Sequence, residues 1–226
     1  MRALLIMIIS LTLSCEKKNI FDDLASTESN EALYLDAKNH LDKFEFDQTV
    51  SIIQNRLSPA FRSQRRVQVT LMHAYGGKCG INFLQIVNRL TNTNQTKLFP
   101  LAMDLFSATD VDSAACENAT DILSALGAVS TRTTNENLFG AILGFAQIGT
   151  TLRERLDADD DGVVDANVHI CQSSGALTDA HINRVSGGMG LIFENLAAIA
   201  SEIDNSGMLG GLEDAQEFCE TPTFPG

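Results

Sequence analysis

Residues 138–149, LFGAILGFAQIG, form the most apolar stretch of the chain beyond its first fifteen residues. Gly140 and Gly144 lie four residues apart, which places both on one face of a helix and lets a partner helix approach closely. The stretch is too short, and too closely followed by Arg153 and Glu154, to cross a bilayer, which requires about 20 apolar residues. It therefore predicts a buried central helix in the C-terminal half of the chain.

Helical periodicity covers most of the remaining chain, because apolar residues recur every three or four positions. The expected helices are residues 31–41, 50–57, 81–90, 97–106, 112–129, 136–156 and 178–203, with a short last one at 211–218. Asp112 and Thr178 are suitable N-caps for two of them. Turn-forming residues separate the runs at 58–59, at Gly76-Gly77 with Gly80, and at 91–94. The sequence therefore predicts an all-α protein, with helical hairpins over residues 31–95 packed on a second helical bundle over residues 96–226.

The first hairpin, from Leu33 to Arg56, resembles a tetratricopeptide-type repeat, in which two antiparallel helices form each unit. The residues that carry the resemblance occupy small, turn-aromatic and apolar positions of that pattern: Ala37, Phe46, Asp47, Thr49 and Ile53. Phe44 stands where the family has a turn glycine, and residues 64–90 match through Ala74-Tyr75 and a glycine-bearing turn. The resemblance implies a groove that recognises a protein or peptide. A generic bundle of helical hairpins is the alternative.

An acidic stretch, LDADDDGVVD at residues 156–165, follows the predicted central helix directly. Five carboxylates within nine residues would repel one another, and the negative end of the helix dipole makes that position less favourable still. A hard cation bound among them would remove the conflict. Counted from the first aspartate, the ligands fall at loop positions 1, 3, 5 and 9, with a backbone carbonyl at 7: Asp157, Asp159, Asp161, Asp165 and Val163.

This D-x-D-x-D-G-x-x-D pattern resembles the calcium loops of EF-hands, thrombospondin type 3 repeats and integrins, with Gly162 at the sixth position. The resemblance implies a structural Ca²⁺ site at residues 157–165. Val168 occupies the twelfth position, where an EF-hand has a glutamate, so a short structural loop is favoured over a sensory EF-hand. Asp160 is expected to be a solvated neighbour. A solvated acidic loop and a Mg²⁺ site are the alternatives.

The first fifteen residues, MRALLIMIISLTLSC, place one basic residue before a short apolar run that ends at a cysteine. This segment resembles a bacterial lipoprotein signal, which implies that residues 1–14 are removed and that Cys15 is acylated. Residues 15–30 would then form a flexible tether. The resemblance places the protein in the cell envelope, as an outer-membrane lipoprotein that faces the periplasm or the cell surface. An ordinary signal peptide and a membrane-embedded anchor are the alternatives.

Four further cysteines are an even number, as expected for a chain exported to an oxidising compartment: Cys79, Cys116, Cys171 and Cys219. Four cysteines allow three connectivities. We expect Cys79 to pair with Cys116 and Cys171 with Cys219, because each bond then joins neighbouring segments. Free buried thiols are the alternative. No C-x-x-C pair is present, so neither a thioredoxin-like site nor a paired-cysteine zinc site is indicated.

The formal charge of −13 disfavours nucleic acid as a partner, because such binding needs clustered Lys and Arg. The chain has no H-E-x-x-H and no G-x-S-x-G motif, and an enzyme would require a cleft that gathers His73, His169 or His181 with carboxylates. We therefore expect a non-enzymatic, lipid-anchored envelope protein that binds a protein or peptide partner. The alternatives are a carrier of a small apolar ligand, in a pocket lined around Gly140 to Gly149, and a purely structural envelope component.

Overall fold

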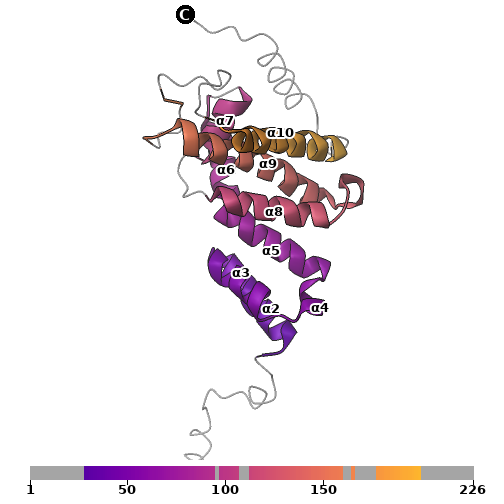
Figure 1. Cartoon of the computed structure of the whole chain (residues 1–226). Coiled ribbons are helices and arrows are strands. Elements are labelled where there is room, and N and C mark those ends of the chain that lie inside the picture. Colours follow the sequence, from indigo (N-terminus) through magenta and orange to yellow (C-terminus); the bar gives the residue numbers. More distant parts are fainter. Residues whose placement is uncertain (1–27, 95–96, 107–111, 160–163, 166–176, 200–226) are drawn as a thin grey trace, which may run out of the picture.

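The helices stack one on the next from the N-terminal pair to the C-terminal pair (Figure 1). This computed structural model describes residues 28–94, 97–106, 112–159, 164–165 and 177–199. Every regular element within those ranges is a helix, so the all-α prediction is confirmed there. Four predicted features lie outside the described residues: the signal peptide, the lipidation site at Cys15, most of the tether and the helix at 211–218.

The N-terminal helices are α2 (Asn30–Asp42), α3 (Phe46–Asn55), α4 (Pro59–Arg62) and α5 (Arg65–Lys78). α2 and α3 pack together as the first predicted hairpin. Ala37 and Thr49 are fully buried between them, and the Thr49 hydroxyl donates to the Ala37 carbonyl oxygen at 3.2 Å. At the turn, Phe44 takes a φ of 62°, in the left-handed region that favours glycine.

The predicted break at Gly76-Gly77 is wrong, because both residues lie inside α5. A Cβ at Gly76 would lie 2.5 Å from the Phe139 ring, and one at Gly77 would lie 2.2 Å from the Phe46 ring. The two glycines therefore admit aromatic rings against the helix, and this packing outweighs a helix-propensity cost of about 1 kcal/mol each. The helix ends at Lys78, one residue after Gly77, and Gly80 follows with a φ of 96°.

The middle of the chain forms α6 (Phe83–Asn92), α7 (Leu98–Phe106), α8 (Ser113–Ala125) and the 3₁₀ turn η1 (Val129–Thr131). α5 packs mainly against α3 and α8, whereas α6 packs chiefly against α7. The second predicted hairpin, α5 with α6, therefore does not pack in the way that α2 and α3 do.

α8 begins where the sequence predicts and ends earlier. The Asp112 carboxylate accepts a hydrogen bond from the Ala115 amide at 3.1 Å, which confirms the predicted N-cap. The expected helix to residue 129 is wrong at its C-terminal end, because Gly127 has a φ of 118° and turns the chain into η1.

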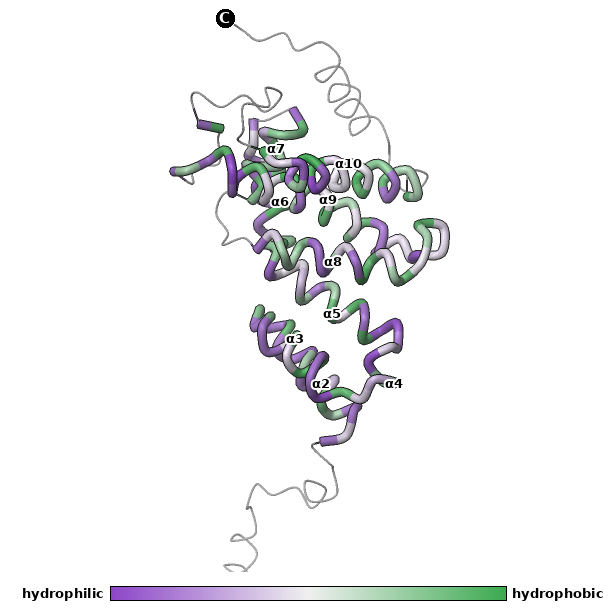
Figure 2. The backbone as a smooth tube through the Cα atoms, viewed as in Figure 1, coloured by the Kyte–Doolittle hydropathy of each residue, from purple (hydrophilic) through white to green (hydrophobic). Residues whose placement is uncertain are grey.

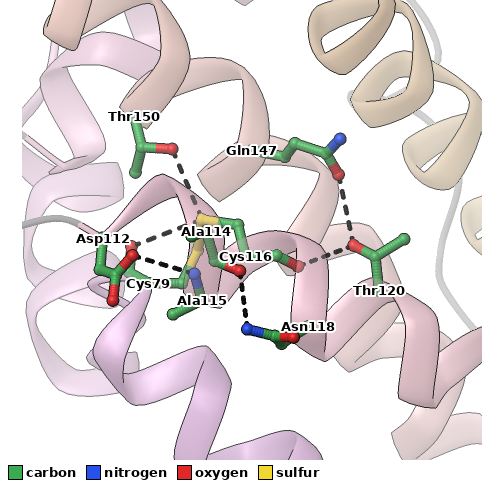
Figure 3. Close-up of a disulfide and its surroundings, with 9 residues drawn as sticks. All are labelled: Cys79, Asp112, Ala114, Ala115, Cys116, Asn118, Thr120, Gln147 and Thr150. Atoms are coloured by element: carbon green, nitrogen blue, oxygen red, sulfur yellow. Dashed lines mark hydrogen bonds between the residues drawn. A yellow bond between two sulfur atoms is a disulfide. The ribbon is translucent and has the colours of Figure 1, made fainter.

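The structure contains the predicted Cys79–Cys116 disulfide, which joins the end of α5 to the first turn of α8 (Figure 3). Both cysteines are buried. The Thr150 hydroxyl of the central helix lies 3.5 Å from the Cys116 sulfur. Cys171 and Cys219 lie outside the described residues.

The C-terminal half is built on α9 (Thr134–Leu156), which packs against α7, α8 and α10 (Asp179–Ile199). The prediction of a buried central helix is confirmed, since fifteen of its residues are buried. A Cβ at Gly144 would lie 2.5 Å from the Gly188 carbonyl oxygen of α10, and one at Gly149 would lie 2.2 Å from the Ala102 carbonyl oxygen of α7. The α10 backbone and the α7 backbone therefore occupy the faces of Gly144 and Gly149, near which the alternative of a small-ligand carrier places its pocket.

α9 starts at a network that ties three helices together. Thr133 and Glu136 form a capping box, in which each side chain accepts from the backbone amide of the other residue. The Arg65 guanidinium donates to both Glu136 carboxylate oxygens, at 3.0 and 2.6 Å, and to the Leu126 carbonyl oxygen at 2.8 Å. Burial would raise the pKa of Glu136, but the hydrogen bonds from Arg65 and Thr133 bring the net pKa below its ordinary value.

The hydrophobic core runs continuously along the stack. Tyr75 and Ile122 pack against both the α2–α5 cluster and the cluster around α8, and Phe145 joins the latter to the α7–α9–α10 cluster. Along most labelled helices hydrophilic and hydrophobic residues alternate, as expected for amphipathic helices (Figure 2). None of the described helices is long and apolar enough to cross a membrane.

Candidate metal site

Three of the predicted metal ligands come together at the C-terminal end of α9. One carboxylate oxygen from each of Asp157, Asp159 and Asp165 lies within 4.8 Å of the others. A search of the His, Cys, Asp and Glu side chains in the described ranges finds these three close enough together to share one ion. Asp161 and Val163, the other two predicted ligands, lie outside the described residues.

Backbone hydrogen bonds return the loop to its starting point. Asp157 caps α9, and its amide donates to the Arg153 carbonyl oxygen at 3.2 Å. The Asp165 amide donates to the Leu156 carbonyl oxygen at 2.8 Å, and the Ala158 amide donates to the Asp165 carboxylate at 3.1 Å. These bonds bring the first and last carboxylates of the predicted loop together, which is the closure that a single-ion site requires.

The three carboxylates differ in their exposure to solvent. The Asp157 side chain is fully buried, Asp165 is half-buried and Asp159 is exposed. Val164, next to Asp165, packs against the apolar cluster of α7, α9 and α10. One side of the group therefore rests on the core, and the other is open to solvent from which an ion can enter.

A buried arginine that the sequence analysis did not assign lies beside the site. Arg153 is 6% exposed, and its Nε donates to the Asp157 carboxylate at 3.4 Å. Its Nη1 also donates to the Phe106 carbonyl oxygen at the end of α7. The spacing of Arg153 and Asp157, four residues apart on one helix, is the sequence signal for this pair.

The arrangement can hold a hard cation. Carboxylate and carbonyl oxygens are the ligands that hard divalent cations take in proteins. The group holds three carboxylates, and the Arg153 guanidinium contacts one of them, Asp157. Because the first carboxylate is buried at the negative end of a helix dipole, a bound cation would relieve an unfavourable electrostatic arrangement.

His181, on the first turn of α10, is buried and contacts Arg155 near the end of α9. It is not part of the metal group. The Arg155 Nε donates to its Nε2 at 3.0 Å, so Nδ1 carries the ring proton and faces the Thr178 hydroxyl oxygen at 3.0 Å. Burial, followed by the charges of Arg155 and Arg184, lowers the pKa of His181 below its ordinary value of 6.5. The ring therefore favours the neutral form.

The other two histidines considered for an enzyme lie elsewhere. His73, on α5, stacks at a tilt against the Phe139 ring with centroids 4.8 Å apart. Burial lowers the pKa of His73, and the charge of Glu136 opposes that shift. His169 lies outside the described residues.

Comparison with known proteins gives no relative from which a role for these residues could be taken. No protein-family model, no curated protein and no solved structure matches the chain.

Proposed function

We propose that this protein is a lipid-anchored binding or scaffold protein of the cell envelope, with a structural Ca²⁺ site at the end of its central helix. The observation that carries the proposal is the convergence of Asp157, Asp159 and Asp165 within 4.8 Å. Their spacing follows a calcium-loop pattern, whose remaining ligands are Asp161 and the Val163 carbonyl. Ca²⁺ suits the group because it accepts six to eight oxygen ligands in a flexible geometry.

Calcium and the disulfide support the same compartment independently. A calcium loop without a twelfth glutamate is expected to bind in the range of extracellular modules, on the order of 10⁻⁴ to 10⁻³ M. Such a site fills in the millimolar calcium found outside cells and stays empty in the cytoplasm. The Cys79–Cys116 disulfide also belongs to an oxidising compartment. Both features agree with the lipoprotein-like signal that ends at Cys15.

The ion has a structural role in this proposal. The loop leaves α9 at Asp157, and Arg153 links that carboxylate to the end of α7 through the Phe106 carbonyl oxygen. Ca²⁺ would therefore fix the direction in which the chain leaves the central helix and would hold α7 and α9 together at that end.

The binding role is proposed for the helical stack, with a protein or peptide of the envelope as partner. The α2–α3 hairpin supports a tetratricopeptide-like unit, because Ala37 and Thr49 pack at its two small positions. Phe44 adopts the backbone conformation for which that repeat uses glycine. The formal charge of −13 argues against nucleic acid.

The calcium site is tested by thermal unfolding of the chain from residue 15 onward, carrying Cys15→Ser, in excess Ca²⁺ and in chelator. With 1 mM Ca²⁺ and the affinity given above we expect the parent to gain about 0.4 to 1.4 kcal/mol, since the ion binds only the folded state. Asp159→Asn should lose most of this gain, and Asp121→Asn, at an exposed carboxylate on α8, should keep it. Equal midpoints for the parent in both buffers would contradict the proposal.

The anchor is tested separately by metabolic labelling with a radioactive fatty acid in a bacterial host. The full chain should take up label and sediment with membranes, whereas Cys15→Ser should take up none. Label on the Cys15→Ser protein would place the acyl group elsewhere.

A further inference from the structure

A polar hollow of about 380 Å³ is bordered by α8, α9 and α10. Ligand pockets in proteins have volumes of about 300 to 1,000 Å³, so a hollow of this size suits a small molecule. None of its lining residues belongs to the candidate metal site. We define the α8–α10 hollow by its polar lining, which comes from all three helices: Glu117, Thr120 and Asp121 of α8, Gln147 of α9, and Asn183 and Arg184 of α10.

Gln147 is the lining residue that points to a ligand. Its side chain is 7% exposed, and the Thr120 hydroxyl shares its proton between the Cys116 carbonyl oxygen at 3.0 Å and Gln147 Oε1 at 3.3 Å. The Gln147 amide nitrogen lies on the side away from Thr120 (Figure 3). Among the described residues this nitrogen has no hydrogen-bond acceptor. A largely buried N–H group without an acceptor is destabilising, so it favours a ligand that brings an oxygen to it.

The charged groups of the hollow divide into two parts. The Arg184 Nε donates to the Glu117 carboxylate, which leaves the other N–H groups of the guanidinium as donors. The Asp121 carboxylate follows Glu117 by one turn of α8, about 6 Å along the helix, and is exposed. Asp121 has no ion pair among the described residues. Donors from Gln147 and Arg184 therefore face one part of the hollow, and an uncompensated carboxylate faces the other.

We propose that the α8–α10 hollow binds a small zwitterion, either a free α-amino acid or a dipeptide. The ligand carboxylate accepts hydrogen bonds from Gln147 and Arg184, and the ligand ammonium donates to Asp121. A simple anion would meet two carboxylates and only one guanidinium. A simple cation would be repelled by Arg184 and would leave the Gln147 amide nitrogen without an acceptor. The inference goes beyond the proposed function, because it depends on neither calcium nor the lipid anchor.

The test is an NMR titration of the ¹⁵N-labelled chain from residue 15 onward with Cys15→Ser, which keeps every described residue. The probes are L-alanine and L-alanyl-L-alanine. We expect one of them to shift the side-chain amide signals of Gln147 and Asn183 in a saturable way, and the tighter-binding probe identifies the source of the ligand. N-acetyl-L-alanine lacks the ammonium and L-alaninamide lacks the carboxylate, so each should bind at least about tenfold more weakly.

Two variants examine the hollow without removing a described contact. Asp121→Asn keeps an acceptor oxygen but loses the charge, so binding should weaken about fivefold. Its matched control, Asp42→Asn, makes the same change at an exposed position of α2 and should bind as the parent does. Ala180→Phe fills the hollow from an exposed position of α10 and should abolish binding, whereas Ala197→Phe, at another exposed alanine of α10, should not.

Circular dichroism should show equal helix content in the parent and all four variants, because the substituted side chains are exposed. Absence of a saturable shift with both probes would overturn the proposal. Equal binding of the capped analogues, or unchanged binding by Ala180→Phe, would do the same. Asp121→Asn should still gain stability from Ca²⁺, so this inference and the calcium site can fail separately.

Discussion

At Gly144 the backbone of α10 lies where a side chain would begin. A Cβ there would lie 2.5 Å from the Gly188 carbonyl oxygen and 2.8 Å from Ile192 Cγ1. The obstacle is backbone, which cannot rotate away as the end of a side chain can. The packing of α9 against α10 at this position therefore depends on the absence of one methyl group.

We predict that Gly144→Ala lowers the free energy of unfolding by about 1 to 3 kcal/mol, because α10 must move away from α9. Gly190→Ala is the matched control on α10, since a Cβ there has nothing within 4 Å. It should be neutral or stabilising by up to about 1 kcal/mol through helix propensity. Urea unfolding of both variants checks the prediction, and equal effects would contradict it.

His181 gives the stability a pH dependence of a definite sign. Its pKa is lowered in the folded state, first by burial and then by Arg155 and Arg184, so the unfolded chain takes up a proton at a higher pH. Stability should therefore be complete above about pH 6.5 and should fall as the pH decreases below it. Urea midpoints from pH 7.5 to 5.5 in chelator should fall less in His181→Asn than in the parent, and parallel curves would exclude His181 as the source.

At the scale of elements, the starts of helices are predictable because the chemistry is local. The Asp112 carboxylate accepts a hydrogen bond from the amide of Ala115, three residues further along the chain. An aspartate at this position can be recognised in the sequence as an N-cap. The interior glycines of α5 are not predictable in this way. Gly76 and Gly77 are decided by Phe139 and Phe46, which arrive from distant helices, so a local rule reads them as a break.

The candidate site divides in the same way. The spacing of its aspartates predicts a group of carboxylates, and Asp157, Asp159 and Asp165 converge as that spacing requires. The pairing of Arg153 with Asp157 is also local, but the burial of Arg153 depends on α7, whose Phe106 carbonyl oxygen it meets. Sequence periodicity gives no indication of which carbonyl a long side chain will reach.

The network at the start of α9 is expected to stabilise the fold in a pH-dependent way. We predict that Glu136→Gln costs about 1 to 2 kcal/mol at pH 7, since it weakens the bonds to Arg65 and Thr133. The pKa of Glu136 is lowered in the folded state, so its contribution is present above its ordinary value of 4.5 and is lost as the pH falls through the folded value. Glu154→Gln, at an exposed position of the same helix, should change stability by less than about 0.5 kcal/mol.

Unfolding of these variants at pH 7 and at pH 3 distinguishes the two contributions. The difference between Glu136→Gln and the parent should shrink in acid. A constant difference would show that the carboxylate charge is not what Arg65 and Thr133 stabilise.

For the whole molecule, the continuous core predicts one cooperative unfolding transition, and the disulfide should raise its midpoint. Cys79 and Cys116 are 37 residues apart. Closing a loop of this length stabilises a protein by about 4 kcal/mol through the entropy of the unfolded chain. Cys79→Ala with Cys116→Ala should lose about that amount in urea unfolding, and a loss below about 1 kcal/mol would contradict the estimate.

The same disulfide gives the chain an unusual topology. It closes a covalent ring that contains α6 and α7, and the Asp112 amide bonds to the Lys78 carbonyl oxygen at 3.3 Å at the base of that ring. A protease that cuts once between residues 80 and 115 would therefore leave a single molecule, which separates into two pieces only on reduction. The two ends of the segment that contains α6 and α7 are thus held together at one point of the helical stack. A different segment with the same end-to-end spacing could replace it without altering how the remaining helices are connected.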